Sequence, residues 1–366
     1  MNLDRLLAGL AATLALLCAG EALLQHRARS LRESETVARP LIDASITPEK
    51  VGRVELIADR VDWHYVKDDG LWRCPDFRGA YVVPDAMKGL LEGLLPGLGT
   101  VVSTDKKELD HYGMIAGRLL QIRLYDPQGG RLAEVSVGRG VPGAASGEAY
   151  VHLTGTREVV LLRFNPRSLA APTVGHGPPL VDGRVLPRAF TLRDIEHIRY
   201  TGFKNYPVQS IDMVQTSTGP PKMPQNGQPF EPGFEWRARS AAGVRVLSAG
   251  NAGGFSAYLQ RLRYRDIVPP GAPSAVGFKA LRGAIAVADG SGNEDVLEIG
   301  GDLENGGGTL VRNRRARLVF VIDSRKLPLF FPPLDSLASK SADLGTVFLQ
   351  AEPGEGLPEE PSAVEK

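Results

Sequence analysis

Residues 119–138, LLQIRLYDPQGGRLAEVSVG, carry the clearest secondary-structure pattern of this chain. Apolar and polar side chains alternate over 119–125 and again over 132–137, which is the pattern of strands with one buried face. The five residues between them, Asp126-Pro127-Gln128-Gly129-Gly130, have the composition of a turn. Residues 119–138 therefore predict an antiparallel hairpin that ends at Gly138.

A second stretch near the C-terminal end has the same layout. AIAVA at 284–288 precedes the turn DGSGN at 289–293, and VLEI at 296–299 ends at Gly300. After each hairpin come a glycine-rich loop and two more strand-like stretches. These lie at 149–153 and 158–164 in the first half, and at 309–311 and 317–322 in the second half. Each half thus predicts a four-stranded antiparallel meander.

The residues that precede each meander also match in order. An alternating stretch opens each half, at 53–57 and at 194–200. A Trp-Arg pair follows at Trp72 and Trp236, and helix-like stretches follow at 84–95 and 255–262. Trp72 precedes Gly113 by 41 positions, and Trp236 precedes Gly277 by 41 positions. Equal spacing across a helix and a turn indicates an internal repeat.

These patterns predict an α+β fold made of two tandem repeats, each a mostly antiparallel sheet with one packing helix, behind one transmembrane helix. The expected domains are an anchor or signal segment at 1–32, a first repeat at 50–170, a linker at 171–190 and a second repeat at 191–340. The second repeat carries an insertion, 203–233, which is rich in Pro, Gly and Gln and is expected to be a surface loop. The acidic residues 352–366 are expected to be a disordered tail.

The N-terminal stretch 6–24 is apolar apart from one glutamate. A helix of this length spans about 28 Å, close to the thickness of a bilayer core. An uncleaved anchor, a cleaved signal peptide and a buried soluble helix are the three readings, and we favour the anchor. Arg27, Arg29 and Arg32 after it outnumber Arg5 before it, which would place the body in the cytoplasm by the positive-inside rule. Long domains can translocate despite this bias, so the rule weakens a placement of the body outside the cytoplasm without reversing it.

Charge and cysteine content limit the possible partners. Lys plus Arg number 43 and Asp plus Glu number 42, so no global basic field attracts nucleic acid. Of the two cysteines, Cys18 lies in the apolar segment, which leaves Cys74 as the one thiol of the body. A structural thiol beside Trp72 is the simpler reading of Cys74, and a reactive thiol is the alternative.

The chain resembles a bacterial family, the "domain of unknown function 4340" proteins. The resemblance rests on the strand unit ending at Trp72, the helix from Pro84, the turn at Tyr112-Gly113 and the hairpin from Gly138 into Tyr150. It covers about residues 50–340 in two copies, and the insertion at 203–233 departs from it. The resemblance implies an extracytoplasmic domain behind one membrane helix, so we expect the body on the periplasmic side of a bacterial inner membrane. It also implies association with ABC-type export or gliding-motility machinery, and no catalytic residue.

Motifs that carry chemistry are missing from the sequence. We find no GxxxxGK[ST], no GxSxG, no HExxH and no metal-ligand spacing. Residues 138–143 match GxGxxG, but a strand rather than a helix is expected after them, so a hairpin loop is the better reading. We therefore predict no catalytic, cofactor-binding or metal-binding residues and no enzyme activity.

Three aromatic residues and one basic run are the remaining candidates. Trp72 and Trp236 recur at matching places, and Tyr112 precedes the turn glycine Gly113. The three are either core anchors of the repeats or binding aromatics. We favour core anchors. Arg312, Arg314, Arg315 and Arg317 form the basic run, which is read as a solvated edge strand rather than an anion site.

Two hypotheses of function follow. The first is a membrane-anchored, non-catalytic interaction or scaffolding protein, an accessory component of an ABC-type transport or motility complex, with permease or ATPase subunits as partners. The second is an envelope hydrolase whose catalytic groups come from distant loops. We favour the first, because the sequence contains no assembled active site.

Overall fold

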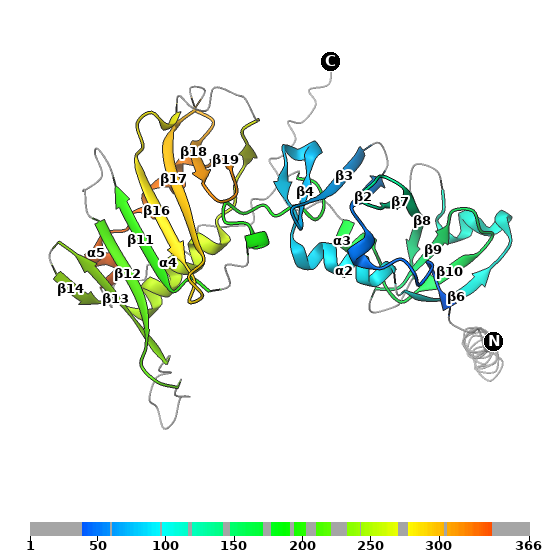
Figure 1. Cartoon of the computed structure of the whole chain (residues 1–366), viewed down its shortest axis with the longest axis horizontal. Helices are drawn as coiled ribbons and strands as arrows, with labels where there is room; N and C mark the ends of the chain where they lie inside the picture. The colour runs from blue at the N-terminus through cyan, green and yellow to red at the C-terminus, as the bar shows by residue number, and fades with distance from the viewer. Residues whose placement is uncertain are drawn as a thin grey trace, which may run out of the picture. The chain divides into compact units, whose positions relative to one another are not determined.

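The structure is a computed structural model. It describes residues 39–58, 61–95, 97–115, 119–141, 147–170, 177–190, 194–202, 210–220, 233–241, 243–269, 277–303 and 306–338. Two antiparallel sheets with a few helices give an α+β fold, as the sequence predicts (Figure 1).

The first sheet has ten strands in the order β1-β6-β10-β9-β8-β7-β2-β3-β4-β5. The strands are β1 (Arg39–Pro40), β2 (Arg53–Ala58), β3 (Val61–Asp68), β4 (Leu71–Cys74), β5 (Ala80–Tyr81), β6 (Leu98–Ser103), β7 (Leu120–Tyr125), β8 (Arg131–Gly140), β9 (Ala149–Leu153) and β10 (Val159–Leu162). The predicted hairpin is β7 and β8, in which Ile122 pairs with Val135.

The second sheet has nine strands in the order β14-β13-β12-β11-β16-β17-β18-β19-β15. The strands are β11 (His197–Gly202), β12 (Ser210–Ser217), β13 (Phe234–Ser240), β14 (Gly243–Val246), β15 (Asp266–Ile267), β16 (Gly283–Ala288), β17 (Glu294–Asp302), β18 (Thr309–Asn313) and β19 (Leu318–Ile322). Its predicted meander runs from β16 to β19, and β11 pairs with β16 in the way that β2 pairs with β7.

The two strand orders correspond element by element. If the second order is read from β15, then β6 of the first sheet takes the place of β15, β10 that of β19, β2 that of β11 and β5 that of β14, with β1 left over. A helix follows the last strand of the series β3-β4-β5 and of the series β12-β13-β14.

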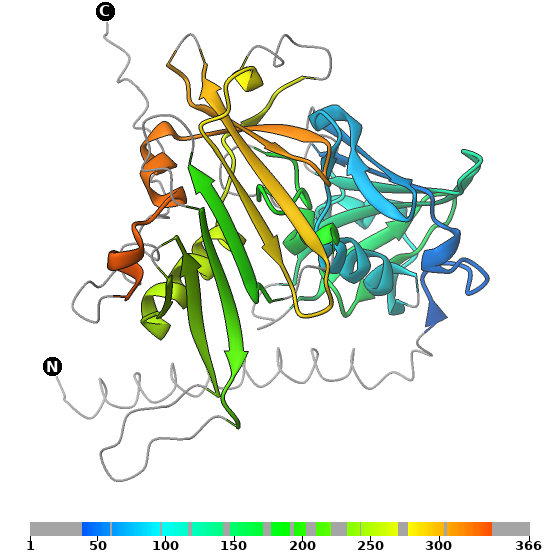
Figure 2. The same ribbon diagram turned by 60° about the vertical axis from the view of Figure 1, so that its left-hand side comes forward.

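Two helices cover one face of the sheets. α2 (Pro84–Leu94) buries Met87, Leu90 and Leu94, and α4 (Ala249–Arg261) buries Phe255 and Leu259. The ring of Phe255 meets Tyr200 of β11 edge to face at 5.7 Å, so α4 packs on the second sheet, as Figure 2 shows. The shorter helices are α3 (Arg167–Ala170), α5 (Leu334–Ala338), η1 (Pro48–Lys50), η2 (Pro75–Phe77), η3 (Lys106–Tyr112), η4 (Arg188–Phe190) and η6 (Ser324–Phe330).

Contacts divide the chain into two compact units. One consists of Met1–Asp62 and Lys88–Ala170, and the other of Trp63–Met87 and Ala171–Lys366. Residues 63–87 therefore group with the C-terminal part of the chain, although they precede the first meander in the sequence. Within the second unit, Tyr65 donates to the carbonyl of Pro179 and Tyr81 donates to that of Ala316.

Two sequence expectations need correction. The predicted loop at 203–233 contains strand β12, which lies between β11 and β13, so the loop assignment is wrong for Ser210–Ser217. Alternation of Ile211 and Met213 with polar neighbours is the signal for this strand, and both are buried. The basic run is not an edge strand, because Arg312 belongs to β18, which pairs on both sides.

The predicted membrane segment at 6–24 and the predicted tail at 352–366 lie outside the described residues. In the part of the chain that the structure describes, no helix is both long enough and apolar enough to cross a membrane.

Candidate functional site

Each sheet has an apolar face toward its helix and a second face that carries polar side chains, which we call its open face. Strand β7 shows how alternation produces the two faces of the first sheet. Leu120, Ile122 and Leu124 are buried, whereas Arg123 and Tyr125 on the other face are half-buried. The open faces are the candidate sites, because a surface that recognises another molecule must be reachable from solvent.

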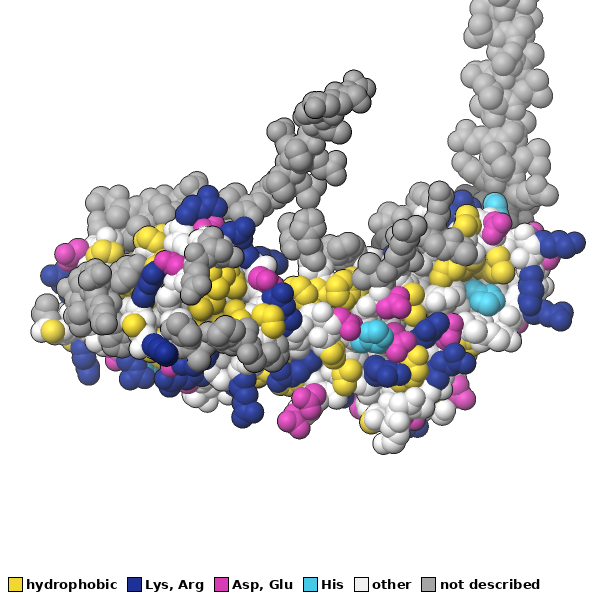
Figure 3. Space-filling model, turned by 90° about the horizontal axis from the view of Figure 1, so that it is seen from above, with side chains coloured by type: hydrophobic (Ala, Val, Ile, Leu, Met, Phe, Trp, Pro, Cys, Tyr) yellow, Lys and Arg dark blue, Asp and Glu magenta, His cyan; other side chains and the backbone are white. Residues whose placement is uncertain are grey.

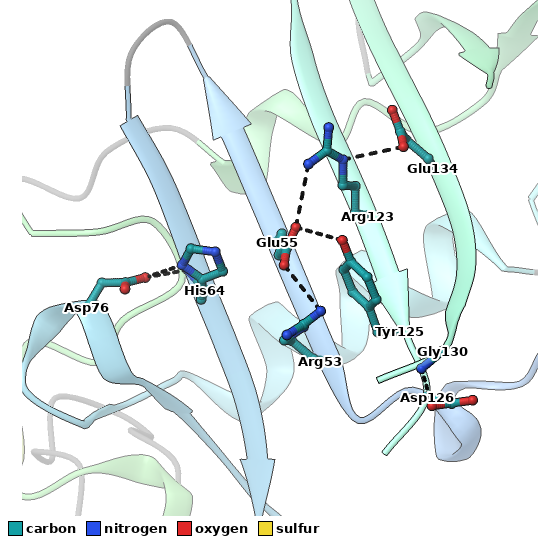
Figure 4. A network of polar contacts seen from close by, with 9 residues as sticks. All are labelled: Arg53, Glu55, His64, Asp76, Arg123, Tyr125, Asp126, Gly130 and Glu134. Carbon is teal, nitrogen blue, oxygen red and sulfur yellow. Dashed lines mark hydrogen bonds and ion pairs between the residues drawn. The ribbon is translucent and has the colours of Figure 1, made fainter. Parts of the chain in front are cut away.

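A charged ladder crosses the open face of the first sheet (Figure 4). Strand register places Glu55 of β2 opposite Arg123 of β7, and Arg123 opposite Glu134 of β8. The guanidinium of Arg123 lies 3.8 Å from the Glu55 carboxylate and 3.3 Å from that of Glu134. Arg131 adds a hydrogen bond of 2.9 Å to Glu134. One arginine thus bridges two carboxylates whose side chains are each about nine-tenths buried.

Tyr125 and Arg53 close one end of this ladder. The Tyr125 hydroxyl donates to Glu55 at 2.9 Å, and the Arg53 guanidinium lies 3.9 Å from the centre of the Tyr125 ring. Burial, and then the hydrogen bond to Glu55, raises the pKa of the Tyr125 hydroxyl. Each charge therefore has an opposite charge or a ring beside it, which makes the face stiff and preorganised.

The open face of the second sheet has a ladder of the same type. Glu298 of β17 faces Arg312 of β18 in the strand register and accepts a hydrogen bond of 2.6 Å from its Nε. Arg314 donates to the same carboxylate at 2.7 Å. Burial opposes ionisation of Glu298, but the hydrogen bonds from the two arginines outweigh it, so its pKa lies below the ordinary value. Arg312 also stacks on Phe278, with 4.6 Å from its guanidinium carbon to the ring centre.

Two histidines pair with carboxylates. His64 Nδ1 lies 2.9 Å from Asp76, as Figure 4 shows, and His197 Nε2 contacts Asp212. Such a pair orients an imidazole for acid–base chemistry when a hydroxyl or thiol lies on the other ring nitrogen. Among the described residues, the ring of His197 has no such partner.

Structure places the predicted aromatics in different environments. Trp236 of β13 lies in the core and is 2% exposed, whereas Trp72 at the equivalent place in β4 is half-buried. Tyr112 ends η3, is half-buried, and meets the ring of Tyr150 edge to face at 4.8 Å. The three residues thus lie in three different elements, β4, η3 and β13.

Two further expectations bear on chemistry. Burial raises the pKa of the Cys74 thiol to about 12, and the side chain is fully buried, so it is a structural thiol. Strand β8 runs through Gly138, Arg139 and Gly140, and β9 pairs with it, which confirms a hairpin instead of a dinucleotide loop.

The charged ladders have no signature in the sequence. Glu55, Arg123 and Glu134 are polar residues at alternating positions of three strands, and the alternation marks them only as outward-facing. On the face in Figure 3, basic and acidic side chains lie interspersed, with hydrophobic ones between them.

In the residues that the structure describes, no group of three or more His, Cys, Asp or Glu side chains is arranged to hold a metal ion. Comparisons of this chain with protein-family models, with curated proteins and with solved structures found no match.

Proposed function

We propose that this protein is a membrane-anchored, non-catalytic interaction module that recruits or holds another protein of the bacterial envelope. The observation that carries the proposal is the pair of open sheet faces, each crossed by a preorganised ladder of charged side chains. Alternating charges on a stiff surface give specificity toward a protein partner with the complementary pattern. They do not bring together a nucleophile, a base and an oxyanion-binding group, which a hydrolase needs.

We further propose that the body arose by duplication of one α+β unit. The matching strand orders support this, and so do equivalent hydrogen bonds in loops of different sequence. Asp126 accepts from the backbone N–H groups of the residues two and four positions later, and Asp289 does the same. After each meander, the side chain of Asn165 or Asp323 accepts from the N–H two positions later.

The close approach of two glycines gives an independent parallel. A Cβ at Gly138 would lie 2.2 Å from the carbonyl oxygen of Tyr112, and one at Gly300 would lie 2.8 Å from that of Gly277. The second strand of each meander thus contains a glycine, and because it has no side chain, the backbone of a turn can pack directly against the sheet. These matches between the two halves support the proposed duplication.

The resemblance and the apolar stretch 6–24 carry the rest of the proposal. The module is anchored by one helix in the inner membrane, with its body on the periplasmic side, as an accessory of an ABC-type transport or motility complex. Its partners are then permease or ATPase subunits. A reporter fused to the C-terminus, active only in the periplasm, tests the orientation.

Recovery of partners from membranes tests the function. The full chain is expressed with an affinity tag, crosslinked in cells, solubilised and purified, and co-purifying proteins are identified by mass spectrometry. We expect permease or ATPase subunits to be enriched, and we expect an Arg123→Glu/Arg312→Glu variant to lose them. Equal recovery by the intact chain, by this variant and by an untagged control would overturn the proposal.

A further inference from the structure

We propose that strand β14 binds an extended segment of a partner polypeptide, which adds to the second sheet as an antiparallel strand with the pattern apolar–acidic–apolar. The inference rests on the proposed interaction function and specifies the kind of partner. It starts from the position of β14 at the end of the nine-stranded order, where one side of the strand has no neighbouring strand among the described residues (Figure 1).

Backbone groups on this free edge are unsatisfied. Leu247 donates its N–H to the carbonyl of Trp236 at 2.9 Å, which places the backbone groups of Arg245, two positions earlier, toward β13 as well. The N–H and C=O groups of Val244 and Val246 therefore point away from the sheet. In the described part of the chain neither residue has a hydrogen-bond partner on that side. An added strand can form four hydrogen bonds with them.

The equivalent edge of the first sheet is occupied. Val82 donates to Trp72 as Leu247 donates to Trp236, so β5 corresponds to β14. Val82 forms an antiparallel bridge with Val181, and the Tyr81 carbonyl accepts from the N–H of Asp182 at 2.8 Å. A segment of the chain itself therefore completes this edge. At β14, one corresponding bond exists, from Ser248 to Leu337 at 3.0 Å, and no described residue donates to the carbonyl of Val246.

Side chains indicate what the added strand must carry. Val244 and Val246 are 61% and 57% exposed, and Val214, two strands away on the same face, is 41% exposed. These are large exposed fractions for valines in a sheet, and apolar residues opposite Val244 and Val246 would cover them.

The charge of Arg245 indicates which residue the bound strand carries between its two apolar ones. It also argues against pairing of β14 with β14 of a second copy of this chain. Arg245 is half-exposed on the other face, where it pairs with Asp335, itself 87% exposed. Two β14 strands paired antiparallel through Val244 and Val246 would place Arg245 opposite Arg245, which is unfavourable. An acidic residue at that position would lie beside Arg245, whose side chain stays 51% exposed next to Asp335.

A labelled peptide, Thr-Val-Glu-Val-Thr with blocked ends, tests the inference against the full chain in detergent by fluorescence anisotropy. We expect saturable binding that weakens about tenfold in Val246→Pro. Proline there removes an N–H that faces the free edge, so the pairing with β13 is kept. Val246→Thr is the matched control, because it keeps the N–H, and it should bind with little loss.

If Val246→Pro fails to fold, exchanging the charges of the peptide's Glu and of Arg245 tests the inference instead. The peptide with Lys in place of Glu should bind the intact chain roughly threefold more weakly, and Arg245→Glu should reverse the preference. No binding, or binding unchanged by both Val246→Pro and Arg245→Glu, would overturn the inference. So would a dimer in sedimentation that Val246→Pro dissociates, because the edge would then bind a second copy. Partner recovery from membranes would still test the proposed function separately.

Discussion

The backbone N–H of Asp182 lies 2.8 Å from the carbonyl oxygen of Tyr81 and closes the edge of β5 with the chain itself. The Asp182 side chain is buried and accepts from the N–H of Arg188 at 2.8 Å, which holds the segment in place. At the corresponding edge, the carbonyl of Val246 has no such partner among the described residues. The edge of β5 is thus closed by a segment of the chain, whereas the equivalent edge of β14 is not closed by any described segment. The proposed binding site is this open edge of β14.

Replacing Gly300 by alanine should destabilise the fold by about 2 kcal/mol, because the new Cβ would overpack the core. It would lie 2.8 Å from the carbonyl oxygen of Gly277 and 2.9 Å from the ring of Phe278. Gly301→Ala is the control, since its nearest contact, 3.6 Å, is an ordinary one. Urea denaturation measures the stability of both variants. Equal stabilities would show that the turn at Gly277 does not pack on β17 as described.

Trp236→Ala should cost about 3–5 kcal/mol, because it empties a fully buried site, whereas Trp72→Ala should cost clearly less, because Trp72 is half-buried. Denaturation followed by circular dichroism gives both values. A Trp72→Ala variant of native stability that no longer recovers membrane partners would identify Trp72 as a binding aromatic instead of a core anchor.

Arg123→Met should destabilise the first sheet by about 2 kcal/mol, because two mostly buried carboxylates, Glu55 and Glu134, lose a shared partner. Arg131→Met is the matched control: Arg131 also pairs with Glu134 but is 60% exposed, so its loss should be close to neutral. Adding Glu134→Gln to Arg123→Met should recover part of the loss. If the stability changes of Arg123→Met and Glu134→Gln simply add in the double variant, the two side chains do not interact, which would contradict the ladder.

Asp295→Asn should stabilise the protein at neutral pH by about 1 kcal/mol, because it removes a buried negative charge, one oxygen of which has no hydrogen-bond partner in the described structure. Burial raises the pKa of Asp295 above 3.8 in the folded state, although Asn313 hydrogen-bonds to it. The folded state therefore binds the proton more tightly, and stability falls as pH rises from about the unfolded value through the raised one.

Thermal unfolding of Asp295→Asn and of the intact chain, measured from pH 3 upward, checks the sign. The two should converge at acidic pH, where the carboxyl is neutral in both states, and separate as pH rises. A variant that is less stable than the intact chain at pH 7 would show that the carboxylate is stabilised by its surroundings.

Local patterns were sufficient for much of the fold. The hairpins around Asp126 and Asp289 were predictable because alternation and turn chemistry act within a few residues. Strand β12 was missed because its flanks are rich in Pro, Gly and Gln, and β14 because four residues are too few to show a period. The family resemblance and the membrane segment were available from sequence alone and stay predictions.

The α+β class, the two antiparallel meanders and the equal spacing of their markers can be predicted from the amino-acid sequence, because these features depend on near neighbours in the chain. Which outward-facing residues meet depends instead on how distant strands pair. Arg123 reaches Glu55 across 68 positions, and the segment 180–182 closes β5 across about a hundred. Pairing of distant strands depends on register and on competition among edges, and neither is encoded in any short stretch of residues.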